Sequence, residues 1–120
     1  MEYIFVGVGG ALGSLARFGI GKWIAGKTEF TSSIGTFLVN ITGAFLLGIC
    51  VSINMNQNLL LFLATGFLGA YTTFSTFMYE GFYLFKINKY ASVFYISGSV
   101  IVGIIAFILG TVTAKFCFGL

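Results

Sequence analysis

Gly66-Phe67-Leu68-Gly69-Ala70-Tyr71-Thr72-Thr73-Phe74-Ser75-Thr76-Phe77 is a run of glycine, hydroxyl and aromatic residues inside a long apolar segment. A helix built only to span a bilayer typically carries Leu, Ile and Val at such a place. Irregular backbone at membrane depth is tolerated only where it is buried in protein or lines a cavity, because lipid offers no hydrogen bonds. The run therefore predicts a membrane helix that breaks at mid-membrane and presents freed backbone groups to an ion.

The composition is typical of an integral membrane protein. Of 120 residues, 58% are hydrophobic and 8% are charged, and the chain has no proline or histidine. Four apolar stretches, at about residues 3–24, 34–53, 59–85 and 91–116, are each long enough to cross a hydrocarbon core of about 30 Å. We therefore expect an all-α, multi-pass protein of the cell membrane, with a single four-helix domain over residues 1–120.

The charged residues are few and unevenly placed. Lysines in the first and third loops outnumber those on the opposite side of the membrane: Lys22, Lys27, Lys86 and Lys89 against Lys115. The positive-inside rule favours both termini outside, but so small a difference also permits insertion in both orientations. A net charge of +3, split in this way, does not indicate nucleic-acid binding. Cys50 and Cys117 lack the spacing of a metal or redox site and are interpreted as small hydrophobic residues.

Pairs of small residues at i, i+4 spacing predict close helix contacts. They are Gly9 and Gly13, Ala44 and Gly48, Gly66 and Ala70, and Ser99 and Gly103. A four-helix chain of this size has little interior in which to enclose a polar pathway. We therefore expect a pathway to form where subunits meet, with these small residues marking the contacts between them.

Two polar residues lie well inside the first two stretches. Asn40, within Gly35–Gly43, needs a partner because an unsatisfied amide in hydrocarbon costs several kcal/mol. Its N–H donors suit an anion that must be stabilised without being trapped; the alternative is an interhelical hydrogen bond of about 0.6 kcal/mol. Arg17 either extends to the headgroups or stands as a cation at the mouth of a water-filled vestibule.

The third and fourth stretches carry further candidates. A helix restarting near Thr72 or Thr73 has a hydroxyl available as its N-cap, and its positive dipole end then points into the protein. Phe74 and Phe77 offer positive ring edges to a poorly hydrated anion, although such a pair is also ordinary core packing. Glu80 either lies in a polar file leading from the site or is close enough to the helix end to reach water. Tyr95 and Ser99 share one helix face at i, i+4 and offer further hydroxyl donors, although Tyr95 is also typical of the membrane interface.

Three segments together resemble the signatures of the Fluc (CrcB) family of small fluoride channels. They are Gly9-Gly10-Ala11-Leu12-Gly13-Ser14-Leu15-Ala16-Arg17-Phe18, Gly35-Thr36-Phe37-Leu38-Val39-Asn40-Ile41-Thr42-Gly43 and Gly69-Ala70-Tyr71-Thr72-Thr73-Phe74-Ser75-Thr76-Phe77. Their order and spacing and the chain length all agree with that family, and the resemblance spans the whole chain. It implies a channel that exports fluoride passively and so lowers cytoplasmic fluoride.

The resemblance also implies an assembly and a set of site residues. The assembly is an antiparallel dimer of the dual-topology type, with two fluoride pathways along the interface and a structural Na⁺ on the two-fold axis. The Na⁺ is held by backbone carbonyls of Gly69 and Thr72 from each subunit. The pathway residues matched by motif are Asn40, Phe74, Phe77, Ser75, Thr76, Tyr95, Ser99 and Arg17. Intact motifs favour a homodimer over a heterodimer with an oppositely oriented paralogue.

Other classes are less well supported by the residues. A small multidrug or guanidinium exporter has a similar size, but it needs a membrane-embedded glutamate in its first span, where this chain has Arg17 and only Glu2 at the tip. A non-transporting subunit leaves the polar residues at depth without a purpose. An enzyme is not expected, because the sequence offers no nucleophile and base pair and no metal-ligand cluster.

Overall fold

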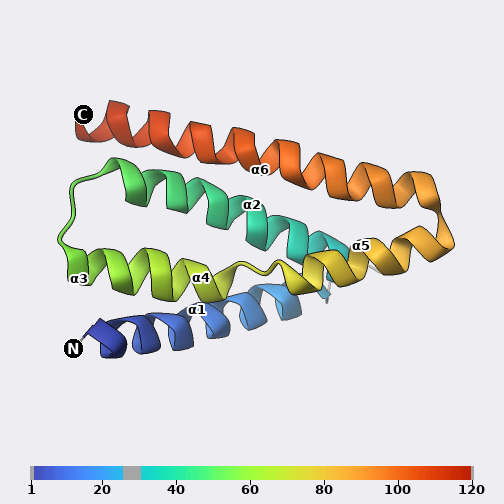
Figure 1. Ribbon diagram of the computed structural model, residues 1–120, viewed down its shortest axis with the longest axis horizontal. Coiled ribbons are helices and arrows are strands. Elements are labelled where there is room, and N and C mark those ends of the chain that lie inside the picture. The colour runs from blue at the N-terminus through green and yellow to red at the C-terminus, as the bar shows by residue number, and fades with distance from the viewer. Residues whose placement is uncertain (1, 26–30, 120) are drawn as a thin grey trace.

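The computed structural model describes residues 2–25 and 31–119, and within them every regular element is helical (Figure 1). The elements are α1 (Glu2–Ala25), α2 (Thr31–Ser52), α3 (Gln57–Leu60), the π-helix η1 (Leu61–Leu68), α4 (Gly69–Tyr71), α5 (Ser75–Ile87) and α6 (Lys89–Phe118). In this described part of the chain, four helical spans are long and apolar enough to cross a membrane: Glu2–Ile24, Ile34–Ser52, Gln57–Ile87 and Lys89–Phe118. The predicted all-α architecture with four spans is confirmed.

The four spans run side by side as an elongated bundle. Figure 1 shows α2 between α6 and the third span, with α1 on the other side of the third span and both termini at one end of the bundle. The closest pairs are α2 with α6 and α1 with η1, and α5 also packs on α6. The third span therefore contacts α1 through its first half and α6 through its second half.

Glycines bring these pairs together backbone to backbone. A Cβ built on Gly9 or Gly13 would overlap the main chain of Phe62 or Phe67 in η1, and one on Gly48 or Gly110 would overlap the main chain of the facing helix. Such close approach between membrane helices is typical of small residues. The prediction that these small residues mark subunit contacts is wrong for Gly9, Gly13, Gly48 and Gly66, because they pack helices within the chain.

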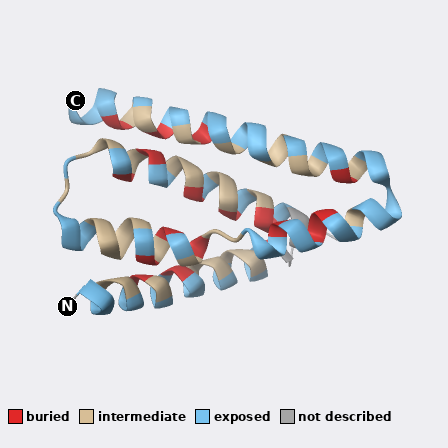
Figure 2. Cartoon of the chain, viewed as in Figure 1, coloured by how far each residue is buried: buried red, intermediate tan, exposed pale blue. Residues whose placement is uncertain are grey.

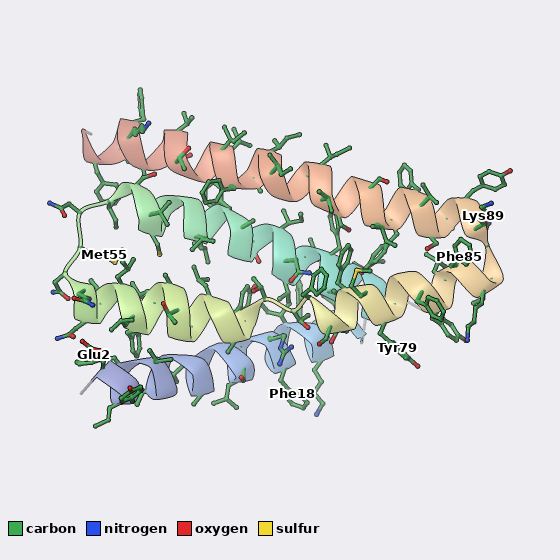
Figure 3. All side chains as sticks on the ribbon, viewed as in Figure 1. Glu2, Phe18, Met55, Tyr79, Phe85 and Lys89 are labelled. Atoms are coloured by element: carbon green, nitrogen blue, oxygen red, sulfur yellow. The ribbon has the colours of Figure 1, made fainter. Side chains whose placement is uncertain are left out.

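The buried core is small and the outer surface is apolar. One buried cluster contains Val39, Cys50, Leu68 and Tyr71, while large hydrophobic side chains point outward along every span. Figure 2 shows the buried residues on the sides where helices face each other, and Figure 3 shows side chains such as Phe18 and Tyr79 pointing away from the bundle. An apolar outer face on long helices is what a bilayer requires.

Two lysines and a capping asparagine lie near the ends of the spans. Lys22 and Lys86 place their ammonium groups 5.6 and 5.3 Å from the ring centroids of residues one turn earlier, Phe18 and Phe82. Asn88 begins α6 by accepting hydrogen bonds from the backbone N–H groups of the next turn. Lys22 lies in the last turn of α1, Lys86 lies in the last turn of α5, and Lys89 begins α6, whereas Lys27 lies outside the described residues.

The third span is not a uniform α-helix. η1 has the wide i→i+5 turn, a form that occurs frequently at functional sites. The short α4 ends at Tyr71, Thr72 has extended backbone with φ −82° and ψ 160°, and α5 begins at Ser75. Residues Thr72–Phe74 thus lie outside any helix, within the run of glycine and hydroxyl residues. We call these three residues the junction.

Candidate functional site

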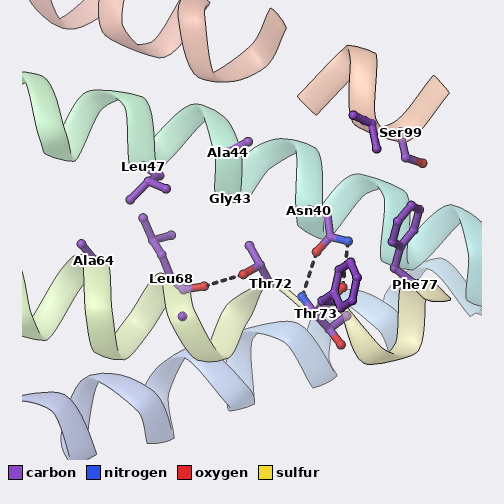
Figure 4. A pocket seen from close by; sticks show the side chains of 13 residues that line it. Asn40, Gly43, Ala44, Leu47, Ala64, Leu68, Thr72, Thr73, Phe77 and Ser99 are labelled. Atoms are coloured by element: carbon purple, nitrogen blue, oxygen red, sulfur yellow. Dashed lines mark hydrogen bonds between the residues drawn. The ribbon is translucent and has the colours of Figure 1, made fainter. Parts of the chain in front are cut away.

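Asn40 of α2 holds the backbone of the junction at two points. Its Nδ2 donates to the carbonyl oxygen of Thr73 at 2.9 Å, and its Oδ1 accepts from the N–H of Thr73 at 2.8 Å (Figure 4). A half-buried amide so paired supplies the junction with the hydrogen bonds that a regular helix would have made. The expected need of Asn40 for a partner is met by main chain, and one of its two N–H groups has no partner among the described residues.

The hydroxyls of the junction complete its local hydrogen bonds. The Thr72 hydroxyl and the Thr72 N–H both donate to the Leu68 carbonyl, at 2.9 and 3.0 Å. The Thr73 hydroxyl accepts from the N–H of Thr76 at 3.3 Å, so that it serves the first turn of α5 as a capping hydroxyl would. The sequence predicts a hydroxyl cap near Thr72 or Thr73; the residue directly before α5 is Phe74, which makes no capping bond, and the Thr73 hydroxyl one residue earlier makes the bond to the first turn.

Backbone carbonyls are left over where the helix ends. Neither Gly69 nor Thr72 has a carbonyl oxygen that accepts a hydrogen bond from any backbone N–H described in the structure outside the regular helices. Since α4 has only three residues, it provides no i+4 donor of its own for these oxygens. In transporters with discontinuous helices, free backbone carbonyl oxygens at the unwound segment coordinate Na⁺. The chemistry of the expected cation ligands therefore fits this place.

A cavity of about 430 Å³ opens beside the junction (Figure 4). It is bounded by α2, the third span and α6, and it brings together several of the predicted site residues. Those among its lining residues are Asn40, Gly69, Thr72, Phe74, Phe77 and Ser99. Residues separated by up to half the sequence thus share one concave surface, as expected for a binding site.

The two aromatic residues of the motif lie together but differ in exposure. The ring centroids of Phe74 and Phe77 are 6.3 Å apart at an interplanar angle of 54°, and Phe77 is 5.4 Å from Tyr95 of α6. Phe77 is only 7% exposed, whereas Phe74 is 75% exposed. Tilted rings at these separations present edges as well as faces to their surroundings. Phe74 therefore lies on the outer surface of the chain beside the cavity.

Glu80 and Ser99 carry polar atoms without partners. Glu80 of α5 is buried against α6; its Oε1 accepts from the Tyr95 hydroxyl at 3.3 Å, while its Oε2 has no partner among the residues described. The Ser99 hydroxyl is also buried and unpaired among the residues that the structure describes. Buried polar atoms are normally satisfied, so unpaired ones call for an explanation such as an unseen ion or water. The interpretation of Glu80 as a residue that reaches water is wrong, because the side chain is buried.

The remaining predicted residues lie outside this cavity. Arg17 on α1 is half-buried and forms no ion pair with a described residue, while Ser75 and Thr76 are exposed on the first turn of α5. No group of three or more His, Cys, Asp or Glu is present that could hold a metal within residues 2–25 and 31–119.

Two contributors to the site were not recognised from the sequence. Gly43, one turn after Asn40, lines the cavity and lies against Thr72. Thr42 is within hydrogen-bond distance of the Tyr71 hydroxyl, at 2.9 Å, and so ties α2 to the end of α4. Both residues belong to the segment Gly35–Gly43 that resembles a family signature, and the i, i+3 spacing of Asn40 and Gly43 places those two on one helix face.

Comparison with known proteins agrees with this arrangement. The family model described as CrcB-like protein, Camphor Resistance (CrcB), matches residues 4–111. The chain is 52% identical over 111 residues to the fluoride-specific ion channel FluC 2 of Clostridium acetobutylicum, covering 92% of this chain and 95% of that protein. It is 43% identical to FluC 2 of Bacillus cereus, covering 92% and 94%, and 40% identical to FluC of Acidobacterium capsulatum, covering 96% and 97%.

The four apolar helices and these relatives define a class, that of small helical multi-pass membrane proteins. Within that class, the match over residues 4–111 and the identity to named relatives decide the family. The chain belongs to the CrcB family, to which the resemblance of its three motifs had pointed. The exporter alternative is thereby set aside.

Proposed function

We propose that this chain is the subunit of a passive, fluoride-selective channel that lets F⁻ leave the cell. The observation that carries the proposal is the junction itself: a helix interruption held by a neutral amide, beside two aromatic rings and a cavity, in a chain related to fluoride-specific channels. The Asn40 N–H that remains free is a donor for an anion, and it carries no net charge that would trap the ion.

The proposed route follows unpaired polar atoms and ring edges. From the cavity at Asn40 it passes Phe74 and Phe77, then the neighbouring hydroxyls and Glu80 toward the α5–α6 end. Fluoride is small and strongly hydrated, so compact donors have to replace its water shell. Ser75, Thr76, Tyr95 and Ser99 are the hydroxyl donors in this proposal, and Arg17 attracts anions at the vestibule.

The proposed assembly is an antiparallel homodimer with two routes at its interface and the third span broken at mid-membrane. The exposure of Phe74 beside an open cavity supports an interface there, because a second subunit would cover both. The free carbonyls of Gly69 and Thr72 would hold a Na⁺ that supplies positive charge near the two routes. A heterodimer with an oppositely oriented paralogue is the alternative assembly.

The test is fluoride efflux from proteoliposomes that contain the purified protein, followed with a fluoride electrode. We expect rapid fluoride efflux once a K⁺ ionophore removes the electrical limit, and little chloride efflux under the same conditions. Protein-free vesicles measure the background leak of fluoride through the lipid. Absence of fluoride efflux from vesicles that contain correctly assembled protein, or equal chloride efflux, would contradict the proposal.

The aromatic rings give a more specific prediction. Replacing Phe77 by Ile is expected to lower fluoride efflux about tenfold, because a contact of about 1.4 kcal/mol with a ring edge is lost and aliphatic side chains do not replace it. Phe74→Ile should act in the same direction. Phe116→Ile, at a ring that is 89% exposed near the end of α6, is the matched control. Normal efflux in both junction variants would leave the rings with a packing role only.

A further inference from the structure

We propose that Gly43 is a positioning residue, which, with Asn40, sets the direction of the Thr72 carbonyl. The inference rests on the proposed function, in which that carbonyl is a ligand of the cation. It assigns a role to a glycine that supplies no proposed ligand of the cation. The two α2 residues lie one turn apart and face the junction, Asn40 at Thr73 and Gly43 at Thr72.

The contact at Gly43 leaves no room for a side chain. A Cβ placed there would overlap the Thr72 methyl carbon Cγ2 and would lie 3.5 Å from Cδ2 of Tyr71 and 3.7 Å from Cβ of Thr72. Gly43 is buried in the interior of α2, where glycine is less favourable for the helix than alanine. Its absence of a side chain lets the junction approach the helix.

Asn40 fixes the peptide group between Thr72 and Thr73. The Thr73 N–H that it binds belongs to the peptide unit whose carbonyl is that of Thr72. No described peptide bond is cis, so in this planar trans unit the C=O and N–H point in opposite directions. Because the Thr73 N–H donates its hydrogen bond to Asn40, the Thr72 carbonyl oxygen is directed away from Asn40.

The N–H, hydroxyl and methyl groups of Thr72 each have a neighbour, whereas its carbonyl oxygen has no hydrogen-bond partner among the described residues. Its N–H and hydroxyl are bonded to the Leu68 carbonyl, its methyl group lies against Gly43, and the following N–H is bonded to Asn40. Displacing the methyl group would rotate this residue and redirect its free oxygen. The Thr72 methyl is thus the group through which Gly43 acts.

The experiment introduces Gly43→Ala into the full-length protein and into the Thr72→Ser variant. Serine keeps the hydroxyl that binds Leu68 but lacks the methyl that the new Cβ would overlap. Two quantities are measured: the Na⁺ concentration for half-maximal fluoride efflux, and the rise in melting temperature when Na⁺ replaces N-methylglucamine. Gly7→Ala, at a glycine with nothing within 4 Å of a Cβ, is the matched control.

In the protein that keeps Thr72, we expect Gly43→Ala to raise the Na⁺ concentration for half-maximal efflux about tenfold. A change of this size is a typical coupling between residues in contact. In the Thr72→Ser background the same change should raise it less than about twofold, because the overlapping atom is gone. The Na⁺-dependent rise in melting temperature should shrink in the first case and be retained in the second. Gly7→Ala should change neither quantity.

Equal effects of Gly43→Ala in both backgrounds, or an unchanged Na⁺ requirement, would overturn the inference. Should Gly43→Ala alone fail to assemble, recovery of assembly in the double variant supports the contact and lack of recovery contradicts it. A wild-type protein that conducts no fluoride would refute the proposed function instead. The melting temperatures would still test the positioning role in that event, because they do not depend on transport.

Discussion

Fluoride efflux through the Asn40→Asp variant is expected to fall at least about 100-fold. Aspartate keeps an acceptor for the Thr73 N–H but loses the donor to the Thr73 carbonyl, so a carboxylate oxygen would face a carbonyl oxygen. It also places a negative charge on the proposed anion route. An uncompensated charge away from water costs about 3–5 kcal/mol, and 1.4 kcal/mol corresponds to a factor of ten.

The matched control for this variant is Asn88→Asp. Asn88 only accepts hydrogen bonds, from Tyr90 and Ala91 at the start of α6, and aspartate caps helices about as well as asparagine. Normal efflux is therefore expected for Asn88→Asp in the proteoliposome assay, together with normal elution of both variants on a sizing column. Efflux through Asn40→Asp at the wild-type rate would remove Asn40 from the route.

Complete replacement of Na⁺ is expected to abolish fluoride efflux and to lower the melting temperature. A ligand at about 100 times its Kd stabilises the folded state by about 2.7 kcal/mol, and this contribution disappears with the ligand. Point mutation is a poor test here because the proposed ligands are backbone oxygens. The measurement compares protein purified in Na⁺ with protein purified in N-methylglucamine, by efflux and by thermal unfolding.

Addition of Na⁺ back to the exchanged protein should restore both properties. K⁺ and Li⁺ at the same concentration serve as controls for ionic strength, and only an ion that fits the carbonyl ligands should restore efflux. Full efflux and an unchanged melting temperature in protein shown by elemental analysis to lack Na⁺ would rule out a structural cation at Gly69 and Thr72.

The sequence predicted the spans and the residue types at the site better than it predicted their partners. Apolar stretches of sufficient length are visible in any window, so the four spans followed directly from composition. The sequence predicts that Asn40 needs a partner. Both of its hydrogen bonds go to backbone atoms of Thr73, and because every residue type offers such atoms, the sequence does not identify Thr73 as the partner. The free oxygens beside it are likewise main-chain groups.

Two further features could not be predicted fully from the sequence: the partners of the small residues and the form of the third helix. The spacing of Gly9 and Gly13 predicts a close helix contact, but it does not tell whether the neighbour belongs to the same chain or to another. The π-helical turn of η1 has no residue pattern of its own, so the wide turn before the junction was not foreseen. Gly43 was hidden for a similar reason, because its neighbour Thr72 is distant in sequence.

The hydrogen bond from the Thr73 N–H to Asn40 places two amide groups in series. A positive ion on the Thr72 oxygen would draw electrons through that peptide unit and make its N–H a stronger donor. The Asn40 amide would be polarised in turn, and its free N–H would bind a halide more firmly. Such chains strengthen each bond by about 10–30%. A cation fixed at the Thr72 oxygen would thus strengthen anion binding at Asn40 without direct contact between the two ions.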